Sequence, residues 1–433
     1  MNKAASIHLK DSSLTDWQDE TLWIVRGKRD NLSKQIPEWE QLRDAAQELK
    51  LYSNSHLPQL LEQFEANAVK NGAVVHWARD AKEYREIISG LLTSHNVKNF
   101  VKSKSMLSEE CELVPYLESL GIDAVETDLG ERIIQLMGQK PSHIVLPAIH
   151  VKREQVGELF TREMDAEEGN CDPTYLTRVA RRNLRAKFLG ADAAMTGGNF
   201  AVASTGEVVV CTNEGNADMG TSCAPLQIAA FGIDKIVPDR RSLGVFTRLL
   251  ARSATGQPVT AYTTHYGAPR EGVEFHIVIV DNGRSRILAD RKHYKLLDCL
   301  RCGACMNTCP VFRRIGGHSY SYFIPGPVGT NLGMTADPKK YKENLSLCSL
   351  CHSCSCVCPA KVDLADQIYA WRQDYHTSEV KHAVSAAMTV VMKHPLLLGA
   401  GLGVAPGGMK VLKAFGLKWG KGREMPEMKK SKK

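Results

Sequence analysis

Two patterns of apolar and polar positions follow one another along the chain. Residues 1–67 are polar, with three tryptophans as scattered apolar anchors, and this region is predicted to be helical. From Gly72 onward, short apolar runs alternate with stretches in which apolar side chains recur at helical spacing. This change of pattern predicts that a second region with a different architecture begins here.

The second region is predicted to be a layered α/β fold. Buried strands are expected at 72–78, 99–103, 123–127 and 143–148. Helices are expected from about 81 onward and at 108–121, 131–136, 152–164 and 173–189. Asp80, with Glu83 three residues later, gives the first of these helices a capping-box start. This β-α-β-α order favours a largely parallel sheet.

From Phe200 the sequence is richer in strands. Further strands are expected at 200–204, 207–212, 259–264 and 274–281, with one helix near 241–254 between them. We therefore expect four regions. They are an N-terminal helical region (1–67), an α/β domain (68–292), a cysteine-rich module (293–375) and a C-terminal helical extension with a basic tail (376–433).

Composition and charge add little to this division. The chain has 433 residues and a formal net charge of +7, part of it in the basic tail at 421–433, which is expected to be a solvated end. The apolar segment 383–404 is interrupted by Lys393, His394 and Pro395, so neither half is long enough to span a membrane. Packing on a partner or on a membrane surface stays open. Without an apolar N-terminal run, a cytoplasmic location is expected.

Nine of the thirteen cysteines fall between Cys299 and Cys358. Such crowding in a cytoplasmic chain indicates metal rather than disulfides. The first motif is Cys299-x2-Cys302-x2-Cys305-x3-Cys309-Pro310. The second, 49 residues further on, is Cys348-x2-Cys351-x2-Cys354-x3-Cys358-Pro359.

This spacing is typical of bacterial ferredoxins, in which the fourth cysteine ligates the neighbouring cluster. Three closely set thiolates can wrap one cube, and the Cys-Pro pair begins a helix that reaches across to the next. We predict two [4Fe–4S] clusters with crossed ligands. The first cluster takes Cys299, Cys302, Cys305 and Cys358, and the second takes Cys348, Cys351, Cys354 and Cys309.

A structural zinc site is the alternative, but it needs only four ligands, usually in two short pairs. Eight cysteines in two copies of a tight run fit it poorly. Cys356 lies inside the second motif as a spare thiol or an alternative ligand. The remaining cysteines are interpreted as ordinary small residues. These are Cys111, Cys171, Cys211 and Cys223.

Three runs of small and polar residues in the α/β domain predict the rim of a ligand pocket, since open α/β sheets bind ligands at strand ends. The alternative is that they are plain turns. The candidate pocket residues are Asn199, Thr205, Glu207, Asn213, Glu214 and Asn216. Neither a Walker loop nor a G-x-G-x-x-G fingerprint is present, so no dinucleotide is expected.

Five segments resemble the lactate-utilization (LUD) domain: VKSKSM (101–106), VETDLGERIIQL (125–136), PSHIVLPAIH (141–150), TGGNFAVASTGEVVVCTNEGN (196–216) and DKIVP (234–238). The cysteine module is similar to the ferredoxin module fused to that domain in the lactate utilization protein B family, through DCLRCGACMNTCPVFRRIGGHSY (298–320) and IPGPVG (324–329). The resemblance implies a fold like that of coenzyme A transferases and sugar-phosphate isomerases. It assigns no catalytic residue to the LUD domain.

The resemblance also implies a role as the iron–sulfur electron-transfer component of a three-protein system that oxidises L-lactate to pyruvate. The implied partners are a cysteine-rich CCG-domain protein, a second LUD-domain protein and an electron acceptor. The alternative is an acyl- or sugar-phosphate-type enzyme, with Glu207 or Glu214 as its carboxylate and regulatory clusters. Nucleic-acid binding is not expected, because no aromatic-basic recognition pattern is present.

Overall fold

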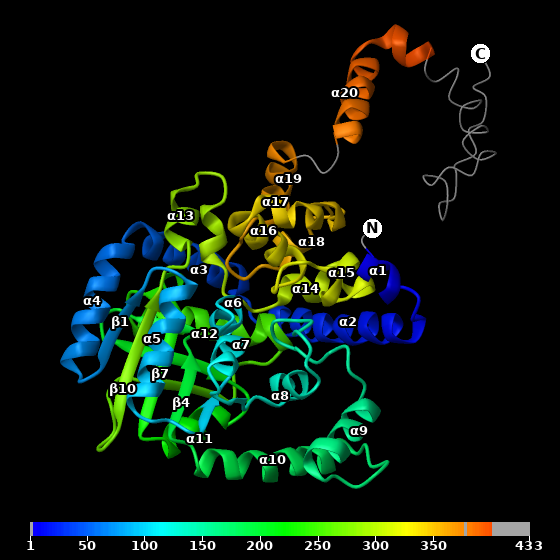
Figure 1. Cartoon of the computed structure of the whole chain (residues 1–433). Coiled ribbons are helices and arrows are strands. Elements are labelled where there is room, and N and C mark those ends of the chain that lie inside the picture. Colours follow the sequence, from blue (N-terminus) through cyan, green and yellow to red (C-terminus); the bar gives the residue numbers. More distant parts are fainter. Residues whose placement is uncertain (1–2, 376–378, 401–433) are drawn as a thin grey trace. The chain divides into compact units, whose positions relative to one another are not determined.

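The computed structural model describes residues 3–375 and 379–400, and a six-stranded parallel sheet forms its centre (Figure 1). Each neighbouring pair of strands runs parallel, so the prediction of a largely parallel sheet is confirmed. The central strand β7 is buried along its whole length, as expected where helices cover both faces. In spatial order the strands are β1 (Val74–Ala78), β10 (Glu274–Val280), β7 (Leu226–Gly232), β4 (Ala193–Gly197), β2 (Phe100–Lys102) and β3 (Ala124–Glu126).

Helices connect and cover these strands. Asp80 caps the first of them through its side chain, which accepts the backbone N–H of Glu83 at 2.9 Å, as the capping-box pattern predicts. The helices of this layer are α5 (Ala81–Ser94), α6 (Met106–Glu110), α7 (Leu113–Ser119), α8 (Leu129–Leu136), α9 (Arg153–Met164), α10 (Pro173–Leu189), α11 (Asn216–Cys223), α12 (Arg240–Thr255) and α13 (Arg284–Ala289).

A second, four-stranded sheet accounts for the strand-rich texture after Phe200. Its strands β5 and β6 form an antiparallel hairpin, and β9 pairs antiparallel with β6. In order the strands are β8 (Ile236–Val237), β5 (Phe200–Val202), β6 (Glu207–Thr212) and β9 (Tyr262–Tyr266).

The segment 143–148, predicted to be a strand, is an irregular loop. The Nδ1 atom of His143 accepts the backbone N–H groups of Val145 and Leu146, both at 3.0 Å, which closes a turn in place of a ladder. Pro147 has no N–H to donate to a neighbouring strand. The apolar run is explained by a different partner, because Ile144 belongs to the apolar core of the cysteine-rich module.

The cysteine-rich module is a set of short helices around the cysteine loops (Figure 1). They are α14 (Ala304–Thr308), α15 (Pro310–Ile315), α16 (Gly326–Ala336), α17 (Pro338–Tyr341), α18 (Ser353–Val357) and α19 (Leu364–Asp374). Among the described residues, three 3-10 helices lie in this module, at Tyr294–Asp298, Gly317–Ser319 and Lys342–Leu347, and one lies in the α/β domain, at Ile233–Lys235. The predicted order of an α/β domain followed by a helical module is confirmed.

The N-terminal helices join the two parts. Helix α2 packs against α12 of the α/β domain and against α14 and α15 of the cysteine-rich module (Figure 1). Helix α3 packs against α12 as well. The N-terminal helices are α1 (Lys3–His8), α2 (Ser12–Lys34), α3 (Trp39–Ser55) and α4 (Leu57–Lys70).

Residues 3–373 form one compact unit, and the described residues that follow belong to a second one. The second unit contains helix α20 (Glu379–Lys393). The predicted basic tail at 421–433 lies outside the described residues, as do residues 401–404 of the apolar segment. No helix within residues 3–375 and 379–400 combines the length and apolar character that crossing a membrane requires.

Candidate iron–sulfur centre and adjoining cavity

The two cysteine motifs have the same backbone geometry at equivalent positions. Arg301 and Leu350, 49 residues apart, both adopt a left-handed conformation, with φ of 58° and 55°. In this conformation the N–H of Arg301 points to Cys299 Sγ at 3.4 Å, and that of Leu350 to Cys348 Sγ at 3.3 Å. A non-glycine residue with positive φ is uncommon, so its recurrence in both loops indicates a shared function.

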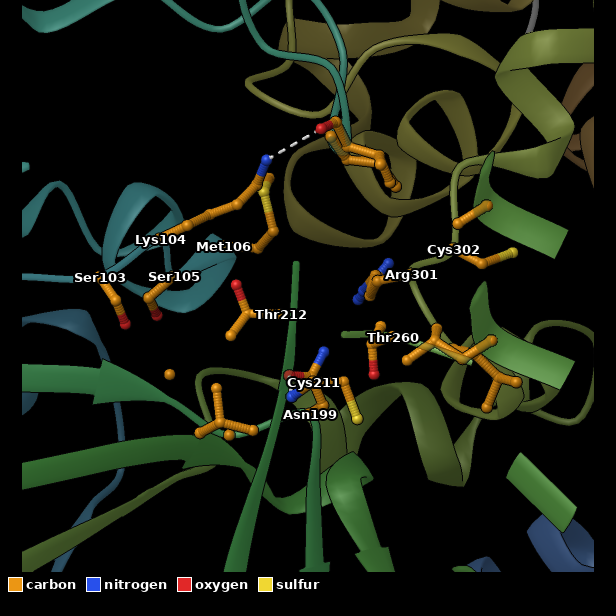
Figure 2. Close-up of a pocket in the computed structure, with 18 of the residues that line it drawn as sticks. Ser103, Lys104, Ser105, Met106, Asn199, Cys211, Thr212, Thr260, Arg301 and Cys302 are labelled. Carbon is orange, nitrogen blue, oxygen red and sulfur yellow. Dashed lines mark hydrogen bonds between the residues drawn. The ribbon is translucent and has the colours of Figure 1, made fainter. Parts of the chain in front are cut away.

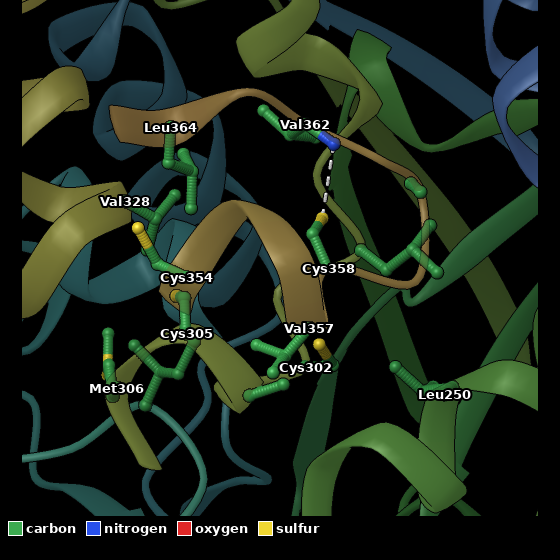
Figure 3. Packing of buried hydrophobic residues seen from close by; sticks show 14 of the residues in the cluster. Leu250, Cys302, Cys305, Met306, Val328, Cys354, Val357, Cys358, Val362 and Leu364 are labelled. Atoms are coloured by element: carbon green, nitrogen blue, oxygen red, sulfur yellow. Dashed lines mark hydrogen bonds between the residues drawn. The ribbon is translucent and has the colours of Figure 1, made fainter. Parts of the chain in front are cut away.

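The fourth cysteine of each motif also accepts a backbone hydrogen bond. The N–H of Phe312 donates to Cys309 Sγ at 3.4 Å, at the start of α15. The N–H of Val362 donates to Cys358 Sγ at 3.3 Å (Figure 3). Such N–H donors stabilise negative charge on sulfur, which is what the thiolate ligands of an iron–sulfur cluster carry.

The thiols form two groups, and each group draws on both motifs. Burial, followed by the nearby Cys299 thiol, raises the pKa of the Cys358 thiol to about 12. Burial also raises the pKa of Cys302, and among its neighbours Cys358 adds most to that effect. The last cysteine of the second motif therefore lies with the first three of the first motif.

The second group has the converse composition, with the last cysteine of the first motif beside the first three of the second motif. Burial, together with the nearby Cys348 and Cys351 thiols, raises the pKa of Cys309 to about 11. Burial and its thiol neighbours, of which Cys309 has the largest effect, raise the pKa of Cys354 to about 12. The two groups meet where Cys305 and Cys354 lie side by side (Figure 3). This grouping is the one that crossed ligation requires.

The spacing of the thiols bears on whether they hold a cluster or a single metal ion. Sulfur ligands about 2.3 Å from one zinc ion lie at most about 4.6 Å apart. Across the described residues, three ligand atoms of this kind within 4.8 Å of one another occur only at His95, Glu274 and His276. No three of the cysteine thiols lie that close together in the described residues, and all thirteen cysteines are free of disulfides. Each of the two groups supplies four thiols, which is the number that a [4Fe–4S] cluster takes.

The remaining cysteines lie outside these groups. Cys356 is exposed on α18. Cys111 is buried beside the central sheet, and Cys171 and Cys223 are half-buried. Cys211 lines the cavity described below.

Two arginines of the N-terminal helices hold the backbone of the second motif. Arg29 Nη2 donates to the carbonyl of Val357 at 3.1 Å, and Arg43 Nε donates to the carbonyl of Cys358 at 3.0 Å. Both arginines are buried. Sequence reasoning missed them, because nothing in a polar helical region distinguishes a buried arginine from an exposed one.

A cavity of about 320 Å³ lies at the carboxyl ends of the parallel strands (Figure 2), within the usual size range for ligand sites. Four of the six candidate pocket residues line it: Asn199, Asn213, Glu214 and Asn216. Its opposite wall is the first cysteine loop, with Leu300, Arg301 and Cys302. Only the first of these walls was expected from the sequence.

Thr205 and Glu207, expected in the same pocket, are not among its lining residues. The carbonyl of Thr205 accepts a hydrogen bond from Asn71 at the end of α4. Glu207 is paired with Arg240 and with His265 Nδ1 at 3.1 Å, on the second sheet. The hairpin of β5 and β6 places its turn, and these two residues, at the end of the strands opposite to the Thr212–Asn216 segment.

Glu214 is a weaker acid than an ordinary carboxyl group. Burial, followed by the nearby charge of Asp128, raises the pKa of Glu214 to about 7, although Lys104 opposes the shift. Its carboxylate accepts the backbone N–H of Leu129 at 3.1 Å. The cavity therefore contains a carboxyl group that can hold or release a proton near neutral pH.

Replacing Glu214 with glutamine is expected to flatten the dependence of stability on pH. Between pH 4.5 and about 7 the folded protein holds a proton that the unfolded chain has lost. The free energy of unfolding of the wild type therefore falls as pH rises through this window, by about 1–3 kcal/mol. Urea unfolding of both proteins at pH 5 and pH 8 measures the difference. Parallel changes in the two proteins would contradict the assignment.

Known proteins share both parts of this architecture. Residues 61–288 match the LUD domain family, and residues 295–362 match the 4Fe-4S dicluster domain family. Lactate utilization protein B of Geobacillus thermodenitrificans is 40% identical over 371 residues, covering 84% of this chain and 78% of that protein. Its namesake from Shouchella clausii is 37% identical over 394 residues, covering 88% and 82%.

Among solved structures, a DUF162 family protein from Deinococcus radiodurans is 15% identical, covering 52% of this chain and 98% of that chain. Its TM-score of 0.30 is too low to carry an argument. The sequence relatives are decisive, because their identity extends over both the α/β domain and the cysteine motifs. This chain belongs to the lactate utilization protein B family.

Proposed function

We propose that this protein is an electron-transfer component in the oxidation of L-lactate to pyruvate. The family and the dicluster domain support a lactate-utilization role that uses iron and sulfur. The observation that carries the finer proposal is the crossed grouping of the cysteine thiols. When bound, two [4Fe–4S] clusters would supply one-electron transfer between adjacent centres.

The residues proposed to hold the clusters are the two groups described above. Cys299, Cys302, Cys305 and Cys358 would hold the first cluster, and Cys348, Cys351, Cys354 and Cys309 the second. The backbone N–H donors to sulfur, and the buried arginines behind the second motif, would set the reduction potentials.

The two groups differ in their access to solvent, which supports a direction for electron flow. In the first group Cys302, Cys305 and Cys358 are buried, and Cys302 lines the cavity. In the second group Cys351 is exposed. Electrons would enter on the cavity side and leave at the surface near Cys351. We propose the CCG-domain protein, the second LUD-domain protein and the final electron acceptor as partners at such surfaces.

The alternative, an acyl- or sugar-phosphate-type enzyme with regulatory clusters, would rest on the cavity. Of its two proposed carboxylates, Glu214 lines the cavity and Glu207 does not. Glu214 has the raised pKa that suits proton transfer. The alternative therefore keeps one candidate carboxylate.

The proposal is tested on anaerobically purified protein, by iron and acid-labile sulfide per chain and by EPR of the dithionite-reduced form. About eight irons and a spin-coupled [4Fe–4S] signal are expected. Lactate oxidation would then be measured with the two partner proteins added back. Zinc in place of iron, or one four-iron cluster, would contradict the proposal.

Replacing Arg43 with glutamine is expected to lower the reduction potential of the first cluster by roughly tens of millivolts, because a nearby cation favours the more negative, reduced state. The guanidinium lies close enough to lower the pKa of Cys358 against the effect of burial. EPR-monitored redox titration measures the shift. Arg43→Lys keeps the charge and should retain most of the potential. Equal potentials in the glutamine variant and the wild type would exclude this role.

A further inference from the structure

The cavity is enclosed by side chains from both parts of the protein (Figure 2). Lys104 follows strand β2, and Arg301 comes from the first cysteine loop. In Figure 2 the Arg301 guanidinium extends into the space between Met106, Thr212 and Thr260. A ligand in this space would touch the α/β domain and the first cysteine loop at once.

Three of the four cations that line the cavity are already paired. Lys104 Nζ lies 2.6 Å from Glu131, Lys235 Nζ lies 3.1 Å from Asp234, and Arg284 bonds both Glu110 and Asp234. Arg301 is the fourth, and within the described part of the chain no carboxylate forms an ion pair with it. It is therefore the cation that stays available for a bound anion.

Two buried polar atoms of the lining have no hydrogen-bond partner among the residues that the structure describes. One is Nη1 of Arg301, a donor, and the other is Oδ1 of Asn216, an acceptor. Asn216 is only 7% exposed and begins helix α11, whose N-cap Gly215 offers no side-chain cap. Buried polar atoms without partners cost free energy, so their presence in the lining, one from the α/β domain and one from the first cysteine loop, indicates a site for a polar ligand.

We propose that this cavity binds an organic carboxylate, with Arg301 as the residue that holds its carboxyl group. The planar guanidinium fork matches a carboxylate. Asn216 and the N-terminus of α11 supply further polar contacts from the α/β domain. The inference rests on the proposed function, and it names the place where the lactate-utilization role meets its substrate class. A ligand held by Arg301 lies beside Cys302, one residue along the chain.

The charge of the lining favours a carboxylate over phosphate. Asp128 and Glu214 also line the cavity and form no ion pair with a cation in the described chain. They would repel a phosphate, which carries more than one negative charge near neutral pH, more strongly than a singly charged carboxylate.

The test is isothermal titration calorimetry of the oxidised, cluster-loaded protein with L-lactate, pyruvate and inorganic phosphate. L-lactate or pyruvate is expected to bind with a dissociation constant of about 1 mM or tighter, and phosphate more weakly. Arg301→Gln should weaken carboxylate binding by about 10- to 100-fold, and Arg301→Lys by less, because lysine keeps the charge without the fork.

Two further variants protect the test from failures of folding or cluster loading. Asn216→Asp adds a negative charge on the wall away from the cysteine loop and should also weaken carboxylate binding. Arg79→Gln changes an arginine whose side chain is 88% exposed and paired with Glu83, so it should bind as the wild type does. Iron content and EPR are measured on every sample.

Each outcome is decisive. Saturable carboxylate binding that falls in both cavity variants and holds in Arg79→Gln supports the site. The absence of saturable carboxylate binding to the wild type, equal binding of phosphate, or unchanged binding in both cavity variants would overturn it. With about eight irons and a normal EPR signal in the same samples, such a result leaves the electron-transfer proposal standing. Loss of the clusters from the wild type would count against that proposal instead.

Discussion

Replacing Cys358 with serine is expected to remove the cluster assigned to the first motif, and the iron content should fall from about eight to about four per chain. Cys358 belongs to the second motif, but its thiol lies with Cys299 and Cys302. The change therefore removes a ligand from the cluster held mainly by the first motif. It leaves intact the cluster held mainly by the second motif, to which Cys358 belongs in sequence. Iron analysis and EPR of the reduced protein measure the loss.

Double variants determine which cluster was lost. With crossed ligands, Cys299→Ser and Cys358→Ser affect one cluster, so the double variant should retain about four irons, as each single variant does. Cys348→Ser combined with Cys358→Ser should lose both clusters. Ligation within each motif predicts the reverse. Cys356→Ser is the matched control, and it should keep all the iron because its thiol is exposed and outside both groups.

Replacing Arg284 with methionine is expected to lower the free energy of unfolding by about 3–5 kcal/mol. Arg284 donates to Glu110 at 2.8 Å and to Asp234 at 2.6 Å, and its side chain is 7% exposed. Methionine fills a similar volume but leaves the buried Glu110 without its cation and leaves Asp234 with Lys235 alone. Urea unfolding of the cluster-loaded protein, followed by circular dichroism, measures the change.

Arg286 offers a matched control on the same short helix, two residues further on. It is exposed, so Arg286→Met should change the free energy of unfolding by no more than about 0.5 kcal/mol. Similar free energies of unfolding for the two methionine variants would mean that the buried carboxylates find another partner or a proton. The ion pairs of Arg284 with Glu110 and Asp234 would then contribute little to stability.

The α/β order was predictable because each element carries a local signal. Strand β6 shows this best, since the run EVVVCT matches Glu207–Thr212 residue for residue. The loop at 143–148 shows the limit of such signals. Its apolar side chains look like those of a strand, but they are buried by the cysteine-rich module, whose packing against Ile144 is a long-range contact that no local pattern contains.

In the candidate site, too, some residues were predictable from local sequence and others depend on tertiary contacts. Cysteine spacing and the runs of asparagine and glutamate are local, and four of the six pocket residues share one cavity. Arg301 sits in the middle of a recognised motif, yet its role depends on which surface the loop faces. Arg301 and Leu350 share a left-handed conformation and an N–H donated to a cysteine sulfur, and only the tertiary structure makes one of the two side chains part of a cavity wall.

The hydrogen bonds from Arg29 and Arg43 to the second motif have a consequence for dividing the protein into modules. Arg29 and Val357 are 328 residues apart in the chain, yet they are in direct contact. A fragment that starts at residue 293 would contain every cysteine of both motifs but would leave the carbonyls of Val357 and Cys358 without these donors. The order of the regions along the chain is thus not their order in space, and the ferredoxin part is completed by the first helices of the protein.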